Sequence, residues 1–207
     1  MIEGASKRLE QWMHRRVAMH AGGPVLELGA GTLNHLKFES SAIQHGYDIV
    51  EPFTELFSGN SSLGAVRHVY RQQTEILQRQ AYGRIISIAV LEHLTDLPRE
   101  LARSGRLLKA DGVFQAGIPS QGGFAWWLGW RCTTGVSYWL RNRLDKGVIM
   151  RHEHVNSAPE IIALVRYFFK EVAIVRFPLP HHQLSLYAYI EARKPNLSRC
   201  EEVLAAC

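Results

Sequence analysis

Two glycines and one carboxylate are the residues of this chain whose types and spacing best suit a nucleoside ligand. Gly29 and Gly31 follow the apolar run 25–28, and glycine at such a turn lets the backbone approach a ligand closely. About twenty residues further on, Glu51 ends a second run that begins at Tyr47. A carboxylate there can accept hydrogen bonds from both hydroxyls of a ribose. The pattern predicts a strand, a glycine turn and a second strand that ends in a ribose-binding acid.

These residues, within VLELGAGTL and YDIVEP, resemble the class I methyltransferases that use S-adenosyl-L-methionine. The segment IISIAVLEHL at 85–94 is similar to the fourth strand of those enzymes and the turn after it. The motifs cover residues 25–119, and the rest of the chain agrees in element order only. The resemblance implies an α/β fold with a Rossmann-like, seven-stranded, mostly parallel sheet, an antiparallel C-terminal hairpin and helices on both faces.

The resemblance also implies which residues contact the cofactor. The usual third glycine of the loop is replaced by Leu33, so polar contacts would come from residues beside it. The residues after the third strand would reach the adenine base. The histidine of the LEH turn would contact cofactor or substrate, or else be satisfied by the backbone. The predicted cofactor-binding residues are Glu27, Gly29, Ala30, Gly31, Thr32, Asn34, Glu51, Gln73, Thr74, Val90 and His93.

Other cofactors and metals fit the sequence less well. The dinucleotide motif G-x-G-x-x-G requires glycine where this chain has Asn34, which disfavours a nicotinamide or flavin oxidoreductase. The three cysteines, Cys132, Cys200 and Cys207, form no CxxC pattern, and no disulfide framework is expected. A His-x-His pair occurs at 152–154, but no third ligand accompanies it. No metal site is predicted.

Methyl transfer to a hydroxyl needs a group that removes its proton, and histidine suits this role near neutral pH. The segment RHEHVN at 151–156 supplies His154 and His152 as candidate catalytic bases, with Arg151 on the acceptor side. His181, between the last two predicted strands, is a further candidate acceptor contact. The alternative interpretation of RHEHVN is a structural turn.

An inserted segment at 120–150 follows the fifth predicted strand, where the family builds its substrate lid. It is rich in tryptophan and arginine, and Trp126 and Trp130 are the predicted acceptor contacts. Aromatic faces stack on sugars and bases, and tryptophan with arginine also suits a membrane interface. A helical cap that completes the core is the third interpretation.

Hydrophobic periodicity predicts the remaining elements of one methyltransferase domain over residues 1–207. We expect helices at 9–17, 33–44, 97–108 and 158–169, and a turn at 109–112. The expected strands are 25–28, 47–51, 65–70, 84–90, 113–118, 172–177 and 184–192. Residues 195–207 form a tail, either a short helix or disordered.

Bulk properties constrain the location and the partners of the protein. The formal net charge is +5, a modest excess that favours an anionic partner without selecting one. The N-terminus lacks the apolar core of a secretory signal, and the longest apolar region falls short of a spanning helix. We expect a cytoplasmic protein, with peripheral contact at the inner membrane face left open. The oligomeric state is not predicted.

The predicted function is S-adenosyl-L-methionine-dependent methyl transfer to a small-molecule or glycan or glycolipid acceptor, at a hydroxyl oxygen. The strings LELGAGTLNHL, RHEHVN and LPHHQLSLYAYIEARK resemble bacterial methyltransferases found with polysaccharide or glycolipid assembly. Two alternatives remain: an RNA methyltransferase, and a catalytically silent cofactor-binding regulatory subunit. Nucleic acid is the less favoured partner, because the chain lacks the N-P-P-Y or D-P-P-Y tetrapeptide of base amino methylation.

Overall fold

The computed structural model describes residues 11–18, 23–39, 45–131 and 152–206. Seven strands form one sheet: β1 (Val25–Leu28), β2 (Tyr47–Val50), β3 (His68–Tyr70), β4 (Tyr82–Ile88), β5 (Leu108–Pro119), β6 (Phe169–Pro178) and β7 (Ser185–Pro195). The α-helices with defined bounds are α2 (Leu97–Leu107), α3 (Phe124–Trp130), α6 (Ala158–Phe168) and α7 (Leu197–Ala205). Short 3-10 helices are η1 (Leu36–Phe38), η3 (Thr54–Phe57), η4 (Ser61–Ala65), η5 (Gln73–Glu75), η6 (Leu91–His93) and η8 (His182–Leu184).

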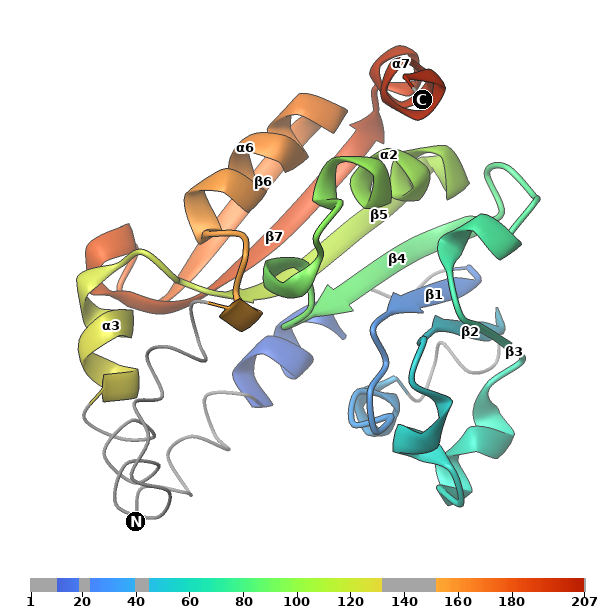
Figure 1. Ribbon diagram of the computed structural model, residues 1–207, viewed down its shortest axis with the longest axis horizontal. Coiled ribbons are helices and arrows are strands. Elements are labelled where there is room, and N and C mark those ends of the chain that lie inside the picture. Colours follow the sequence, from blue (N-terminus) through green and yellow to red (C-terminus); the bar gives the residue numbers. More distant parts are fainter. Residues whose placement is uncertain (1–10, 19–22, 40–44, 132–151, 207) are drawn as a thin grey trace.

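The strand order is β3-β2-β1-β4-β5-β7-β6 (Figure 1). Strands β1 to β5 pair in parallel, whereas β7 runs antiparallel to both β5 and β6. The order reverses at β1, so the loops after β1 and β4 leave adjacent strands at the same edge. Parallel sheets of this kind bind ligands at such a switch point, beyond the carboxyl ends of the strands. The expected fold class, with its C-terminal antiparallel hairpin, is confirmed.

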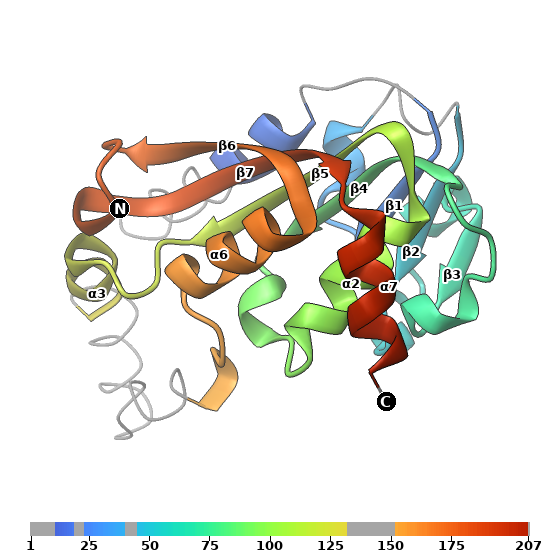
Figure 2. The same ribbon diagram turned by 90° about the horizontal axis from the view of Figure 1, so that it is seen from above.

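Helices cover both faces of the sheet, and each face has its own core. Helices α2, α6 and α7 lie on one face, and the helical segment 11–17 lies on the other (Figure 2). Alternating residues of one strand serve the two cores: Ile85 of β4 packs beneath α2 and α6, whereas Ile86 packs with Met13 and Val17. All three of these apolar residues on the second face are nearly inaccessible. The continuous apolar runs of the central strands arise because both faces are buried.

The helix expected at 33–44 is not present as predicted. The residues after the glycine loop form turns and then the short 3-10 helix η1, while 40–44 lie outside the described residues. Leu33 has a positive φ of 63°, a left-handed conformation that a right-handed helix cannot contain. Its side chain is buried. Hydrophobic packing therefore fixes a backbone that interrupts the expected helix.

The turn expected at 109–112 is a strand irregularity. Strand β5 already begins at Leu108, but its pairing with β4 jumps from Tyr82–Leu108 to Arg84–Val113. Between these two pairs, the single residue 83 of β4 lies opposite the four residues 109–112 of β5, and the extra residues leave the ladder. Polar turn-forming residues at this site therefore indicated a real local break.

The C-terminal tail forms the helix α7 from residue 197 to 205. Its Cys200 is fully buried, and a Cβ placed on Gly105 of α2 would lie 2.7 Å from the sulfur of that cysteine. The missing side chain of Gly105 thus lets α7 dock closely on α2. Across the described part of the chain, no helix has the length and apolarity that spanning a bilayer requires.

Candidate functional site

A cavity of about 770 Å³ lies at the carboxyl ends of β2, β1 and β4. This volume is within the usual range for small-molecule sites. The structure brings ten of the eleven predicted cofactor residues to its wall. They are Glu27, Gly29, Ala30, Gly31, Thr32, Asn34, Glu51, Gln73, Val90 and His93.

The two glycines of the loop have different structural roles. A Cβ on Gly29 would lie 2.4 Å from Cγ2 of Val90, so this glycine permits contact between the loops after β1 and β4. Gly31 has a φ of 50°, and a Cβ there would meet no atom within 4 Å. Of the two, Gly31 therefore leaves open space at the cavity wall, whereas Gly29 serves protein packing.

Glu51 is fixed by the backbone on both of its oxygens. The amide of Gly31 donates to Oε2 at 2.8 Å, and the amide of Phe53 donates to Oε1 at 3.0 Å. The side chain is only 4% exposed. Each carboxylate oxygen still has accepting capacity, so a vicinal diol in the cavity could donate to both. The two backbone hydrogen bonds thus hold both carboxylate oxygens of Glu51 in place as hydrogen-bond acceptors for a ligand in the cavity.

Glu27 is a second carboxyl in the cavity wall, 3% exposed. The hydroxyl of Tyr47 donates to its Oε2 at 2.7 Å. Burial raises the pKa of Glu27 to about 6, against the opposing influence of His35 and Tyr47. A positively charged ligand group nearby would favour the ionised form of this carboxyl.

The two residues predicted to reach a base are separated by the structure. Gln73 is buried in the cavity wall, where its amide donates to Oε2 of Glu100 at 2.6 Å. Thr74 does not line the cavity; it is exposed and donates to Gln72 instead. The turn of η5 thus directs these adjacent side chains differently, and the cavity lining does not support the prediction of Thr74 as a cofactor residue.

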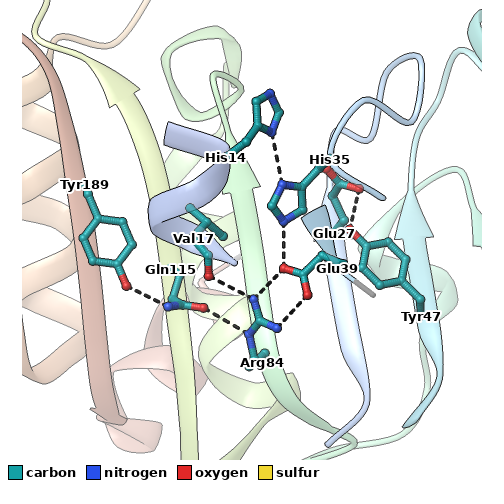
Figure 3. Close-up of polar contacts among 9 residues, drawn as sticks. All are labelled: His14, Val17, Glu27, His35, Glu39, Tyr47, Arg84, Gln115 and Tyr189. Atoms are coloured by element: carbon teal, nitrogen blue, oxygen red, sulfur yellow. Dashed lines mark hydrogen bonds and ion pairs between the residues drawn. The ribbon is translucent and has the colours of Figure 1, made fainter. Parts of the chain in front are cut away.

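Figure 3 shows a buried polar network on the face of the sheet that the segment 11–17 covers, and this network connects that segment with β4, β5 and β7. Arg84 of β4 donates to Glu39 at 2.8 and 3.0 Å and to the carbonyl of Val17 at 3.1 Å. It also donates to Gln115, whose amide donates to the hydroxyl of Tyr189. Arg84 is 1% exposed, so its charge depends on these partners.

Two histidines connect this network to the cavity wall. Nδ1 of His14 and Nδ1 of His35 are 3.1 Å apart, and Nε2 of His35 is 2.8 Å from Oε1 of Glu39 (Figure 3). Burial, reinforced by His35, lowers the pKa of His14 to about 4. Burial tends to raise the pKa of Glu39, but the hydrogen bonds from His35 and Arg84 hold it below its usual value.

The RHEHVN segment packs against the turn after β4. The side-chain amide of Asn156 donates to the carbonyls of Leu91 and Leu94, at 2.9 and 2.7 Å. The backbone amides of Val155 and Asn156 both reach the carbonyl of Glu92. Asn156 therefore has the structural role that the turn interpretation assigns to this segment. The sequence alone did not single out this residue.

His154 comes next to the cavity but does not line it. Its ring meets the ring of His93 edge-on, with centroids 4.6 Å apart, and the ring of Trp126 lies 6.0 Å away. Its Nδ1 is 2.7 Å from the side-chain oxygen of Gln121. The structure thus gathers two predicted acceptor-side residues, His154 and Trp126, around the wall residue His93.

The other predicted acceptor-side residues are not part of this group. His152 and His181 are exposed and lie outside the cavity wall. His181 caps η8, where its Nδ1 accepts from the amide of Gln183. Arg151 lies outside the described residues, as does most of the 120–150 insertion, and Trp130 is described only as the last residue of α3.

The structure adds wall residues that sequence reasoning missed, notably Met13, His14, His35, Arg71 and Glu100. No motif marks them, because they come from elements far apart in the chain. The polar residues His14 on an otherwise apolar helix face and His35 beside Leu36 were the available signals. Among the described residues, no cluster of histidine, cysteine and acidic side chains suits a metal ion.

No protein-family model matches this sequence, and no curated protein matches it. Solved structures match along most of the chain. A possible histamine N-methyltransferase from Thermotoga maritima, described as S-adenosylmethionine-dependent, is 16% identical, with a TM-score of 0.62 and 90% of each chain covered. The 1,6-didemethyltoxoflavin-N1-methyltransferase of Burkholderia thailandensis is 19% identical, with a TM-score of 0.61, covering 89% of this chain and 77% of that one.

A third match is an O-methyltransferase family protein from Burkholderia thailandensis, 15% identical, with a TM-score of 0.60. The alignment covers 90% of this chain and 56% of that one. These identities are too low to transfer an acceptor, but the shared arrangement of the sheet is extensive. The chain therefore has the fold of class I S-adenosylmethionine-dependent methyltransferases.

Proposed function

We propose that the cavity binds S-adenosyl-L-methionine and that the protein transfers its methyl group to a hydroxyl oxygen of a small-molecule, glycan or glycolipid acceptor. The observation that carries the proposal is the position of Glu51. Its two backbone-oriented oxygens face the same cavity as Gly31, whose missing side chain leaves space for a ligand. The two adjacent hydroxyls of a ribose can each donate a hydrogen bond to one of these carboxylate oxygens.

The remaining wall residues fit the other parts of such a cofactor. Glu27 is a buried carboxyl that a cationic group would stabilise in its ionised form, and S-adenosyl-L-methionine carries an ammonium and a sulfonium. The loop after β1 lacks the third glycine of dinucleotide-binding turns, which matters little for a ligand without phosphate. When bound, the sulfonium supplies an activated methyl group for in-line displacement.

The protein's own contribution is to hold donor and acceptor together and to exclude water. Wall residues after β1, β2 and β4 would hold the donor, and the acceptor would approach beside His93, His154 and Trp126. The aromatic ring of Trp126 suits the apolar face of a sugar. A glycan or glycolipid acceptor is further supported by the resemblance of the RHEHVN and LPHHQLSLYAYIEARK strings to enzymes of polysaccharide assembly.

The test is formation of S-adenosylhomocysteine, followed by mass spectrometry, with S-adenosyl-L-methionine and three separate acceptor pools. The pools are bacterial glycans and nucleotide sugars, bacterial lipid extract, and total RNA. We expect turnover with the first or second pool, and loss of that turnover in Glu51→Ala but not in Glu55→Ala, an exposed acid outside the cavity wall. Turnover with RNA alone would contradict the acceptor, and cofactor binding without any turnover would indicate a silent subunit.

A further inference from the structure

The order of the strands indicates where the reacting end of the cofactor lies, if the proposed function holds. Gln73 follows β3, Glu51 follows β2, Gly31 follows β1 and His93 follows β4, and these four strands are neighbours in that order. The resemblance to class I methyltransferases implies that the base of a ligand whose ribose is held at Glu51 lies at Gln73, on the side of β3. Its sulfonium end then extends across β1 toward β4, where His93 lines the cavity.

Hydrogen bonding fixes which nitrogen of His93 can accept a proton. Nδ1 is 2.8 Å from the carbonyl oxygen of Glu153, and a carbonyl only accepts, so Nδ1 carries hydrogen. In the neutral ring, Nε2 therefore holds the lone pair. Nε2 makes no hydrogen bond to any residue that the structure describes, and the side chain is 42% exposed. His93 thus presents a basic nitrogen in the cavity wall.

A buried carboxyl stands beside that nitrogen. Oε1 of Glu92 is 4.0 Å from Nε2 of His93, and Glu92 is 2% exposed. Its Oε2 has no hydrogen-bond partner within the described residues. Burial raises the pKa of Glu92 to about 7. A proton placed on Nε2 of His93 would give this isolated carboxylate an opposite charge, which stabilises both ionised groups.

The other titratable ring that faces His93 is that of His154. It packs edge-on against His93 and is oriented through its contact with Gln121. Since His154 does not line the cavity, its role is to hold the ring of His93 rather than to touch the acceptor. The hydrogen bonds that the side-chain amide of Asn156 donates to the carbonyls of Leu91 and Leu94 keep this arrangement in place.

We infer that His93, rather than His154, is the general base for the proposed methyl transfer, and that Glu92 and His154 are its positioning residues. The acceptor oxygen forms a bond to the methyl carbon while its proton passes to Nε2 of His93. The bond between methyl carbon and sulfur breaks, and its electron pair remains on sulfur. The products are a methyl ether, S-adenosylhomocysteine and the His93 imidazolium, which faces Glu92.

A pair of cofactor analogues tests the position of His93 without knowledge of the acceptor. Sinefungin carries an amine where S-adenosyl-L-methionine carries its sulfonium methyl, whereas S-adenosylhomocysteine has only a thioether there. At pH 8 the ammonium of sinefungin can donate to Nε2 of His93. Calorimetry of the His93→Ala variant should show about tenfold weaker binding of sinefungin, the loss of one charge-assisted hydrogen bond, and less than about threefold weaker binding of S-adenosylhomocysteine.

The control is His68→Ala, which removes a half-exposed histidine of the edge strand β3 outside the cavity and should leave both affinities unchanged. Equal losses for the two ligands in His93→Ala, or no loss, would overturn the inference while leaving the proposed function intact. If neither ligand binds the unmodified protein, the proposed function itself fails and the assignment of His93 falls with it.

A second variant tests the role of Glu92. Calorimetry of Glu92→Gln at pH 8 uses the same two ligands. We expect weaker binding of sinefungin and little change for S-adenosylhomocysteine, because the substitution removes a negative charge beside Nε2 of His93 that would stabilise the bound ammonium. Equal changes for the two ligands, or no change, would show that Glu92 does not support the base.

Discussion

The backbone amide of Gly31 donates a hydrogen bond to Oε2 of Glu51 across 2.8 Å. This contact ties the loop after β1 to the end of β2, two segments twenty residues apart in sequence. Their separation in the sequence follows from the parallel pairing of β1 and β2. The chain must cross back over the sheet to start β2, and only at the end of β2 does Glu51 lie beside Gly31. This part of the cavity wall is thus held by local backbone bends and the buried carboxylate of Glu51.

The different roles of the two loop glycines can be separated by alanine substitution. Gly29→Ala should reduce the free energy of unfolding by about 2–4 kcal/mol, because its Cβ would collide with Val90 and its φ is +70°. Gly31→Ala should cost only about 1–2 kcal/mol for the backbone conformation but weaken cofactor binding, since its Cβ enters the cavity. Urea unfolding and calorimetry measure these two effects.

Gly59→Ala is the matched control for the glycine series. Gly59 has a φ of +79°, a Cβ on it would meet no atom within 4 Å, and it has no place in the cavity wall. The variant should lose stability by about the same amount as Gly31→Ala and keep full affinity. Equal stability of Gly29→Ala and Gly59→Ala would contradict the packing role of Gly29.

The buried ion pair of Arg84 should be costly to break. Arg84→Met leaves the Glu39 carboxylate buried without its cationic partner, and we expect a loss of about 3–5 kcal/mol in the free energy of unfolding. Arg79→Met removes an exposed pair with Glu201 and should cost less than about 1 kcal/mol. Comparable losses in the two variants, measured by urea unfolding, would rule out a central role for the network.

Glu27 should make stability depend on pH in a defined window. Its pKa is about 6 in the folded protein, against 4.5 for an ordinary exposed glutamate, so the folded state holds the proton more tightly than the unfolded state. Stability therefore falls as pH rises through these two values, by about 2 kcal/mol in total between about pH 3.5 and 7 and by about 1 kcal/mol between about pH 4.5 and 6.

The contribution of Glu27 is isolated by comparing the unmodified protein with Glu27→Gln, since Glu92 and His14 also titrate abnormally. The difference in unfolding free energy between the two proteins should change by about 2 kcal/mol between about pH 3.5 and 7, with about 1 kcal/mol of it between about pH 4.5 and 6. The exposed substitution Glu55→Gln should give no such change. A pH-independent difference for Glu27→Gln would mean that Glu27 is not buried as described.

The central strands and the helices at 97–107 and 158–168 could be predicted because burial produces regular apolar patterns. The helix expected at 33–44 failed because the positive φ of Leu33 is set by tertiary packing, which periodicity does not report. Thr74 lies outside the cavity wall for a related reason: its position in the sequence indicates the turn after β3, but not which side chain of that turn faces the cavity.

The contacts of the polar network beside the cavity could not be predicted from the sequence. His14, His35, Glu39 and Arg84 come from three separate segments, and no sequence motif links them. Only the packing of the 11–17 helix over β4 brings them together (Figure 3). The same holds for His93 and His154, whose contact depends on the return of the chain after the 120–150 insertion.

The most direct measurement is calorimetric titration of S-adenosylhomocysteine into the unmodified protein, Glu51→Ala and Glu55→Ala, with circular dichroism to verify the fold. We predict binding of one ligand per chain, at least about tenfold weaker binding in Glu51→Ala through loss of the ribose acceptor, and unchanged affinity in Glu55→Ala. Absence of binding to the unmodified protein, or unmodified affinity in a folded Glu51→Ala variant, would contradict the assignment of this cavity to an adenosyl cofactor.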